Sequence, residues 1–339
     1  MTKAFISGCA GLTLTEEEIV FFRTEDPWGL ILFARNIDTP AQVSRLTQAF
    51  RYAVGRDNAP VLVDQEGGRV QRLKPPNWPK YPAPKLFGDL YKTNNAVGLR
   101  AAFLGAQLIA SDLIAVGINI DCAPCLDIRF PETVDAIGDR ALSSDPEVVA
   151  ILGQAMINGA LAGGVLPVVK HLPGHGRAMV DSHLVLPKVD AEKSALEKVD
   201  FVPFRALSDV ALGMTAHLLY ENIDKSAPGT QSRRVIEDII RTEIGFDGCL
   251  MSDDISMKAL GGDVTSRSSK ILEAGCDLVL HCNGDMDEMK AVAVAMPELA
   301  DKAKQRCDRA LAQLPKQDVI FDRAEAWNEF KTLTGWSSV

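Results

Sequence analysis

The densest group of chemically active side chains lies between Lys170 and His183. This segment begins K-H-L-P-G-H-G and ends in D-S-H. Asp181 stands two residues before His183, close enough for its carboxylate to orient the imidazole and stabilise its charged form. Such a pair suits a general acid and base that works near neutral pH. An Asx-type turn beside an incidental histidine is the alternative interpretation.

The residues before this pair predict a strand followed by a loop. Lys170 and His171 end an apolar run, so we expect both to point hydrogen-bond donors toward a pocket at the strand end. The proline and the two glycines that follow break regular structure. We expect the loop 172–180 to close over a bound substrate, as lids commonly do.

A second candidate is the acid pair Asp253 and Asp254, which closes a largely apolar run beginning at Cys249. Adjacent residues of a strand face opposite sides, so only one of the two acids should point into a pocket. An ionised carboxylate there is a natural nucleophile toward an electrophilic sugar carbon. The alternative, an aspartate that caps the following helix, fits Asp254 better than Asp253.

Two further segments combine carboxylates with guanidinium donors. The first runs D-Q-E-G-G-R-V-Q-R from Asp64 to Arg72 and turns at its two glycines. An aspartate suits vicinal sugar hydroxyls, and an arginine suits hydroxyl, carbonyl or carboxylate oxygens. The second segment, I-G-D-R, places Arg140 after the apolar run 118–123. Either segment alone is weak evidence for one chemistry.

Eight short apolar runs must position these residues. They alternate with longer segments of helical periodicity, such as 99–116, which predicts a parallel sheet. Eight units favour closure into a TIM-type (β/α)8 barrel, an α/β fold, forming a single catalytic domain over 1–339. A doubly wound open sheet is the alternative, but no G-x-G-x-x-G follows an early strand. The predicted strands are 4–9, 30–34, 61–64, 118–123, 166–171, 212–217, 249–253 and 277–282.

The predicted strands are asymmetric along their length. They begin with apolar residues, most of them end in polar ones, and all five histidines lie at or just beyond such ends. The catalytic groups of barrels lie at the C-terminal ends of the strands, where the loops converge. Stability alone gives no reason to collect polar residues at one rim, so the pattern predicts a functional site there.

Composition narrows the class of protein. The chain of 339 residues has a net charge of −9, from 45 acidic and 36 basic residues, and no basic stretch, which argues against nucleic acid as a partner. Its seven scattered cysteines include one C-x-x-C, Cys122 and Cys125, without a second pair, which suits a reducing cytosol. No apolar run reaches roughly 18 residues, and the stretch 4–6 is shorter than the roughly 7–15 apolar residues of a signal peptide. We expect a cytoplasmic protein without a membrane partner.

Together the four segments resemble the family 3 glycoside hydrolases, specifically the bacterial single-domain β-N-acetylglucosaminidases of peptidoglycan recycling. The resemblance runs from G-L-I-L-F-A-R-N at residue 29 to L-H-C-N at residue 280. The signature K-H-F-P-G-H-G followed by D-S-H is highly specific, and Leu172 replaces its usual phenylalanine. The family's S-D-D-L-S-M reads S-D-D-I-S-M here, and D-Q-E-G-G-R-V-Q-R is intact.

This resemblance implies a barrel that hydrolyses terminal β-linked N-acetylglucosamine, with 1,6-anhydro-muropeptides as the expected substrate. It implies Asp253 as the nucleophile of a retaining mechanism and His183 as proton donor and acceptor, assisted by Asp181. Members of this short type need no metal or other cofactor, so the implied partner is a small-molecule substrate. The implied sugar ligands are Asp64, Arg72, Arg140, Lys170 and His171.

Three other interpretations fit part of the pattern. A β-glucosidase or β-xylosidase of the same family would share the spacing. A sugar-binding protein without activity would need the sugar ligands, but not both the nucleophile and the acid. A metal-dependent barrel hydrolase is the third, although no H-x-H ends an early strand and no H-E-x-x-H occurs. Its ligands would be His171, His175, His217 and Asp253.

Overall fold

The barrel predicted from the sequence is present in the computed structural model, which describes residues 1–130, 137–179, 186–315 and 321–337. Eight parallel strands pair with their neighbours in chain order, and the last pairs with the first to close the barrel. All eight predicted strands are confirmed, with small shifts at their ends. The strands are β1 (Lys3–Ser7), β2 (Pro27–Leu32), β3 (Val61–Val63), β6 (Ile120–Asp121), β7 (Leu166–Leu172), β9 (Leu212–Thr215), β11 (Cys249–Asp254) and β12 (Leu278–His281).

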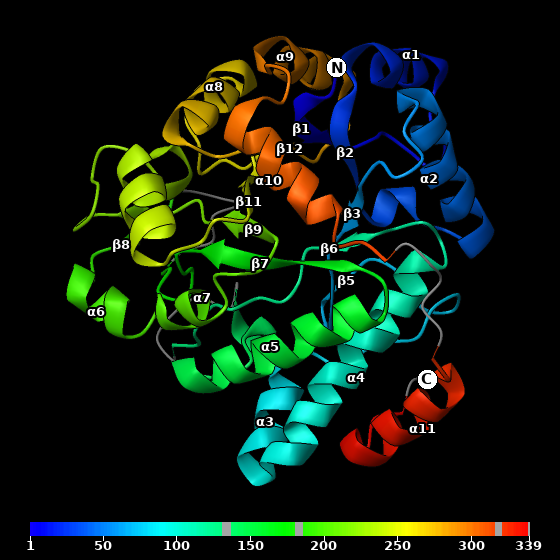
Figure 1. The fold of residues 1–339 in the computed structure, drawn as a ribbon, viewed down its shortest axis with the longest axis vertical. Coiled ribbons are helices and arrows are strands. Elements are labelled where there is room, and N and C mark those ends of the chain that lie inside the picture. Colours follow the sequence, from blue (N-terminus) through cyan, green and yellow to red (C-terminus); the bar gives the residue numbers. More distant parts are fainter. Residues whose placement is uncertain (131–136, 180–185, 316–320, 338–339) are drawn as a thin grey trace.

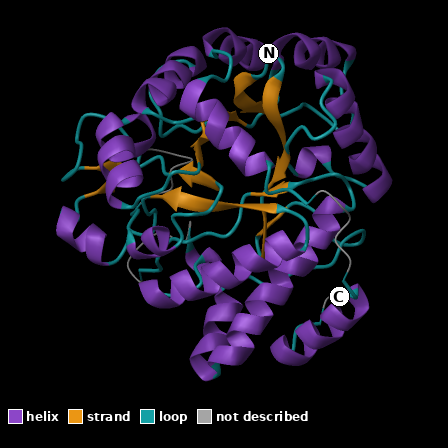
Figure 2. Ribbon diagram, in the orientation of Figure 1, coloured by secondary structure: helices purple, strands orange, loops and turns teal. Residues whose placement is uncertain are grey.

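Helices surround the strands on the outside (Figures 1 and 2). The last helix lies beside the outer face of α4 rather than between two strands (Figure 1). A π-helical segment, Arg234–Glu243, connects β9 and β11. The α-helices are α1 (Glu16–Glu25), α2 (Pro40–Val54), α3 (Lys85–Thr93), α4 (Asn95–Ile114), α5 (Pro146–Ala162), α6 (Lys193–Lys198), α7 (Val202–Ala206), α8 (Val264–Ala274), α9 (Met286–Ala295), α10 (Asp301–Leu311) and α11 (Arg323–Thr334).

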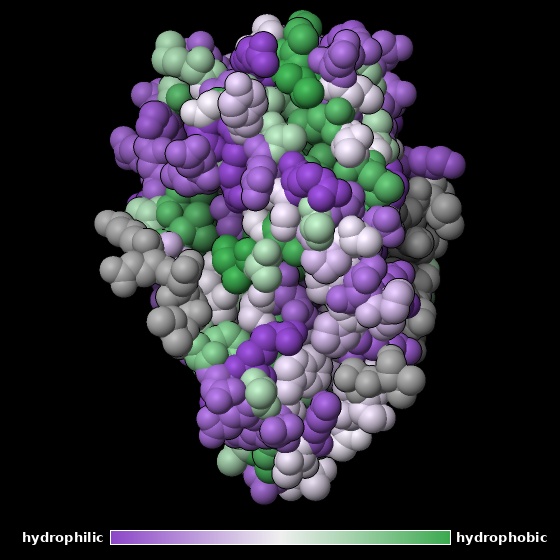
Figure 3. Space-filling model, turned by 90° about the vertical axis from the view of Figure 1, so that its right-hand side faces the viewer, coloured by the Kyte–Doolittle hydropathy of each residue, from purple (hydrophilic) through white to green (hydrophobic). Residues whose placement is uncertain are grey.

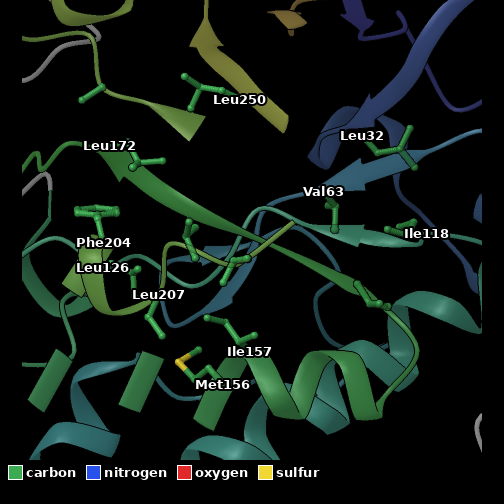
Figure 4. Close-up of a cluster of buried hydrophobic side chains, with 14 of the residues drawn as sticks. Leu32, Val63, Ile118, Leu126, Met156, Ile157, Leu172, Phe204, Leu207 and Leu250 are labelled. Carbon is green, nitrogen blue, oxygen red and sulfur yellow. The ribbon is translucent and has the colours of Figure 1, made fainter. Parts of the chain in front are cut away.

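Successive strand residues divide between two cores, as the two-residue period of a strand requires. On β2, Ile31 packs inside the barrel, whereas Leu30 and Leu32 pack outward against the helices. Figure 4 shows this outer core, where Met156 and Ile157 of α5 lie below the outward side chains of the strands. Burial on both sides of the sheet holds the strand ends rigidly, which is what a site built on them requires.

Helix α4 is the longest helix of the described residues and is largely apolar. By length and composition it could cross a membrane, with 20 residues and a mean hydropathy of 1.4 over its most apolar window, of which 61% is buried. In the fold α4 packs against α3, α5 and α11, so its apolar side chains contact neighbouring helices. The Asn94 side chain caps its first turn by accepting from the N–H groups of Ala96 and Val97.

The face seen in Figure 3 is mostly hydrophilic, with hydrophobic residues scattered among charged ones. Large apolar side chains that are exposed, such as Tyr52 on α2 and Val294 on α9, belong to different elements. Single exposed apolar side chains of this kind are ordinary on a protein surface.

Short elements follow the strands at the C-terminal rim and shape the loops there. An antiparallel hairpin, β4 (Gln65–Gly67) and β5 (Val70–Gln71), follows β3. A parallel pair, β8 (Lys188–Val189) and β10 (Leu219–Tyr220), joins the loops that follow β7 and β9. A 3-10 turn, Gly138–Arg140, follows β6. These elements carry or border most of the residues predicted to bind the substrate.

Candidate active site

A solvent-open cavity lies at the C-terminal ends of the barrel strands. Its volume is about 180 Å³, and its walls come from the strand ends, the β4–β5 hairpin and the 3-10 turn. Apolar side chains such as Met214 and Leu280 complete the lining. The polar residues that line it include Asp64, Arg72, Arg140, Lys170, His171 and Asp253.

Lys170 is the centre of a cluster of charges in this cavity. Its Nζ lies 2.8 Å from Asp64 Oδ1 and 2.7 Å from Glu66 Oε1, although the side chain is almost fully buried. Arg140 donates two hydrogen bonds to the same glutamate, 2.9 Å from Nε to Oε2 and 2.8 Å from Nη2 to Oε1. Arg72 Nη2 lies 3.3 Å from Asp64 Oδ2. The cluster pairs two carboxylates with three cations.

The cluster fixes the charge of its members. Burial by itself would raise the pKa of Asp64, but the positive charges of Lys170 and Arg72 lower it to about 2. In the same way, Arg140 and Lys170 overcome burial and lower the pKa of Glu66 to about 2. Burial would lower the pKa of Lys170, but the two carboxylates raise it above its usual range. Near neutral pH the cavity therefore offers fixed anionic acceptors beside fixed cationic donors.

The β4–β5 hairpin positions two members of this cluster. The Gln65 side chain accepts hydrogen bonds from the N–H groups of Arg72 (2.8 Å) and Leu73 (3.0 Å), which closes the hairpin at its base. Gly67 has a φ of +94°, and a Cβ there would collide with the carbonyl oxygen of Pro82. The glycines of D-Q-E-G-G-R are therefore needed to turn the chain between Glu66 and Arg72.

Lys170 and His171 both line the cavity, although neighbouring strand residues normally face opposite sides. The pairing of β7 with β9 shifts its register between Lys170 and Leu172, which interrupts the alternation. As expected, both side chains reach the pocket at the strand end, although the His171 ring also bonds through Nδ1 to Asp127, outside the lining. The shift in register allows both residues to line the cavity.

Asp253, the next-to-last residue of β11, lines the same cavity and is half-buried. Burial would raise the pKa of its carboxyl, but His217, His171, the hydrogen bond from the N–H of Asp254 (2.8 Å) and Lys170 together lower it. An ionised carboxylate that lines the cavity can attack an electrophilic carbon held there.

Asp254 has a structural role that differs from the helix cap considered as an alternative. It also lines the cavity, where β11 shifts register against β12, but its Oδ1 accepts from the N–H groups of Ser256 (3.0 Å) and Cys282 (3.2 Å). The next helix, α8, begins ten residues later and is capped by Asp263. The alternative in which Asp254 caps a helix does not match the structure, because Asp254 closes an Asx turn and connects β11 to the end of β12.

A chain of hydrogen bonds supports the backbone next to Asp253. Because a carbonyl oxygen only accepts, His217 Nε2 carries a hydrogen and donates to the carbonyl of Asp254 at 3.0 Å. Burial lowers the pKa of His217, so its ring is neutral near pH 7 and Nδ1 accepts from Thr230 Oγ1 at 2.8 Å. Thr215 Oγ1 lies 2.7 Å from Thr230 Oγ1. The chain connects β9 to the peptide that follows Asp253.

Comparison with known proteins identifies the family to which this geometry belongs. Residues 23–314, which include the strand ends and loops that surround the cavity, match the glycosyl hydrolase family 3 N terminal domain. The chain belongs to glycosyl hydrolase family 3. The resemblance seen in its sequence motifs is thereby confirmed.

Relatives of this family 3 hydrolase occur in several bacteria. A beta-hexosaminidase of Alkalilimnicola ehrlichii is 37% identical over 334 residues, covering 97% of this chain and 92% of its own. One of Pseudomonas aeruginosa is 40% identical over 286 residues, covering 84% and 83%. Among solved structures, NagZ from Neisseria gonorrhoeae in complex with N-trifluoroacetyl-D-glucosamine has a TM-score of 0.88, 31% identity and 98% coverage of both chains. The chain is a glycoside hydrolase with the (β/α)8 fold.

The structure of this family 3 hydrolase places six of its eight predicted site residues in one cavity. They come from strands and loops up to 189 residues apart in the chain, from Asp64 to Asp253. The other two, Asp181 and His183, lie outside the described residues, so their role as acid and base stays a prediction. The described loop before them is anchored by Arg177, which pairs with Asp200 (2.8 Å) and lies over the ring of Phe130.

Two carboxylates of the site were not singled out by the sequence analysis. Glu66 lies inside the D-Q-E-G-G-R motif. The signal for it was that Lys170 and Arg140, both predicted site residues, need a carboxylate as counter-charge. Asp127, which bonds to His171 at 2.6 Å, follows β6 by six residues. The rule that polar residues gather at strand ends includes Asp127 once the loop after β6 is counted with the strand end.

The metal-site interpretation of the histidines does not match the geometry of the described residues. There, the side chains close enough to share an ion are Cys125, Asp127 and His171, whereas the expected set was His171, His175, His217 and Asp253. His171 Nδ1 lies only 2.6 Å from Asp127 Oδ2. Two ligands of one tetrahedral zinc, each at about 2.1 Å, would be roughly 3.3 Å apart. The distance between His171 Nδ1 and Asp127 Oδ2 is that of a hydrogen bond and is too short for two ligands of one zinc ion.

Proposed function

We propose that this family 3 hydrolase releases terminal β-linked N-acetylglucosamine with retention of configuration. The observation that carries the proposal is the ionised Asp253 carboxylate in the same cavity as the fixed charges around Lys170. A nucleophile and a rigid set of partners for sugar hydroxyls thus share one site. The relatives named beta-hexosaminidase, and the N-trifluoroacetyl-D-glucosamine in the NagZ complex, support an acetamido sugar as substrate.

The proposed reaction has two steps. In the first, an Asp253 oxygen forms a bond to the anomeric carbon, the bond from that carbon to the leaving oxygen breaks, and protonated His183 gives its proton to the leaving group. In the second, neutral His183 takes a proton from water while the water oxygen attacks the same carbon and frees Asp253. Asp181 holds the His183 ring in place. Two displacements restore the original configuration.

The charged cluster supports the sugar-binding roles. Asp64 keeps lone pairs free for two neighbouring hydroxyls, because Lys170 and Arg72 each approach a different oxygen of its carboxylate. Lys170 and Arg72 themselves have further N–H groups for hydroxyl oxygens. Arg140 is held by Glu66, and His171 lines the cavity beside Asp253. Because these ion pairs already hold the side chains in place, the site needs less reorganisation when the sugar binds.

We further propose that the natural substrate is an N-acetylglucosaminyl 1,6-anhydro-muropeptide and that the reaction takes place in the cytoplasm, as part of peptidoglycan recycling. The seven cysteines support a reducing compartment because all of them are buried thiols, including Cys249 and Cys307, whose sulfurs are 3.4 Å apart. The substrate itself rests on the sequence motifs shared with recycling enzymes. Fractionation of cells, with the protein located by immunoblot, tests the compartment.

The sugar specificity is tested with two chromogenic substrates. We expect kcat/KM for p-nitrophenyl N-acetyl-β-glucosaminide to exceed that for p-nitrophenyl β-glucoside by at least about 100-fold, because a site built for the acetamido group loses its partners when that group is missing. A preference for the glucoside would support the β-glucosidase alternative. Hydrolysis of neither substrate would support the non-catalytic sugar-binding alternative.

The acid role of His183 predicts a dependence on the leaving group. In His183→Ala, kcat/KM for a disaccharide with an alkoxide leaving group should fall by about 10²–10⁴-fold. For an aryl glycoside the fall should be much smaller, because a phenolate of low pKa leaves without a proton. kcat/KM is the parameter to compare, since it reports the steps up to cleavage of the glycosidic bond. Equal losses for both substrates would contradict the role.

A further inference from the structure

Asp127 is a fully buried carboxylate on which four hydrogen-bond donors converge. It lies in the loop after β6, and its Oδ2 accepts from His171 Nδ1 at 2.6 Å and from Cys125 Sγ at 3.2 Å. Its Oδ1 accepts from the backbone N–H of His175 at 2.6 Å and, more distantly, from that of His171 at 3.4 Å. One side chain therefore holds both the ring and the backbone at the end of β7.

The charge of Asp127 determines which nitrogen of His171 carries hydrogen. Burial would raise the pKa of the Asp127 carboxyl, but its interaction with the His171 ring, followed by that with His175, holds the pKa below its usual range. An ionised carboxylate only accepts, so Nδ1 of His171 must donate. Burial raises the pKa of Cys125, which keeps its sulfur a thiol and a donor as well.

This pairing leaves one ring nitrogen of His171 for a ligand. Asp127 does not line the cavity, whereas His171 does, and Nδ1 is occupied by Asp127. The nitrogen available to a substrate in the cavity is therefore Nε2. Loss of the Asp127 charge would allow the opposite tautomer and would free the ring to rotate.

We propose that Asp127 is a positioning residue of the sugar site: it fixes the tautomer and the plane of His171 so that Nε2 meets the substrate. The inference rests on the proposed function only for the identity of the substrate. The hydrogen-bond geometry itself is a property of the unliganded protein. Asp127 acts through His171 and does not itself reach the cavity.

The test uses Asp127→Asn, which preserves the shape but not the acceptor pattern. The two backbone N–H groups require the asparagine oxygen at the Oδ1 position, so its NH₂ group faces His171 Nδ1. His171 must then accept at Nδ1 and carry its hydrogen on Nε2. Heteronuclear ¹⁵N spectra of the imidazoles distinguish the two tautomers, and a chain with five histidines gives a tractable spectrum. His171→Asn identifies the signals.

We expect the Nδ1–H form in the wild type and the Nε2–H form in Asp127→Asn. We also expect KM for the aryl N-acetylglucosaminide to rise by about 10–100-fold, because Nε2 of His171 changes from acceptor to donor and no longer matches its partner on the sugar, with a smaller change in kcat. The matched control is Asp277→Asn. Asp277 is equally buried at the opposite end of the barrel and accepts from Leu250 N, Arg241 and Arg306. It should lose stability without a change in KM.

Several results would overturn the proposal. An Nε2–H form of His171 in the wild type would do so without any variant, even if Asp127→Asn failed to fold. So would an unchanged tautomer in Asp127→Asn, or a rise in KM no larger than that of Asp277→Asn. The tautomer is measured without turnover. A protein that hydrolysed no N-acetylglucosaminide would therefore contradict the proposed function, but not the assignment of the His171 tautomer.

Discussion

Asp253→Ala should lower kcat by at least about 10⁴-fold on every substrate, because no other described carboxylate of the cavity is available to form the glycosyl-enzyme. Asp64 and Glu66 are held by Lys170 and its neighbouring arginines, and Asp254 is used by backbone N–H groups. KM should change much less, since the sugar ligands remain. Steady-state kinetics on the aryl N-acetylglucosaminide measures both parameters.

Asp254→Asn is the matched control for this variant. A single oxygen of Asp254 accepts from Ser256 N and Cys282 N, and asparagine keeps that oxygen. We expect kcat to fall by less than about tenfold. The covalent step is tested directly by trapping with a 5-fluoro glycoside and mapping the labelled peptide. A label on another residue, an inverted product, or full turnover by Asp253→Ala would refute the assignment.

Lys170→Met should cause the largest loss of stability of any single change in the site, about 3 kcal/mol. Methionine fills the space of the alkyl chain but leaves two buried carboxylates with less compensation. The estimate lies at the low end for a broken buried ion pair because Arg72 and Arg140 still contact Asp64 and Glu66. Urea unfolding at pH 7 measures the change. We also expect kcat/KM to fall, because the sugar loses a donor and Asp64 loses its orientation.

The pH dependence of this loss follows from the two carboxylates. The folded protein holds the pKa of Asp64 and Glu66 at about 2, below the usual values of 3.8 and 4.5. Groups with a lowered pKa contribute stability that is complete above the usual pKa and is lost as the pH falls toward the folded value. Without Lys170 both values rise, so the difference between wild type and variant should shrink as the pH falls from about 5 toward 2.

The control for Lys170→Met is Lys85→Met. Lys85 pairs with Asp89 one turn along α3, where both side chains are largely exposed. Pairs of this kind contribute at most about 1 kcal/mol, and their effect is screened by salt. A loss from Lys170→Met no larger than that from Lys85→Met would contradict the view that the buried cluster is a tightly coupled unit. A difference that grew on acidification would contradict it as well.

The fold could be predicted because its signal is local and repeated. Each strand is a short apolar run, and the segment 99–116, most of which lies in α4, has apolar residues at helical spacing. The strand ends differ from the prediction: β2 begins three residues earlier, at Pro27. Where a strand ends depends on its pairing partners, and these lie far away in the chain. The prediction of one domain over 1–339 stays a prediction.

The site was predicted as a set of residues more fully than as an arrangement. The motifs placed Asp64, Lys170 and Asp253 at strand ends, and closure of the barrel brings those ends together. No motif indicated that Glu66 is shared by Lys170 and Arg140, because the sharing depends on how the hairpin folds over the rim. The structural role of Asp254 could not be predicted for the same reason, since its partner Cys282 follows a different strand.

The barrel, its family and the residue types at the rim could be predicted from the sequence alone, because period, motif and strand-end chemistry depend on neighbouring residues. Which charges meet depends on contacts between residues that are distant in the chain. Register shifts in β7 and β11 turn Lys170 and His171 to one side and give Asp254 its backbone partners. Burial then sets the protonation state of each group, since the pKa of a carboxyl in a low-dielectric interior depends on which cations lie within a few ångströms.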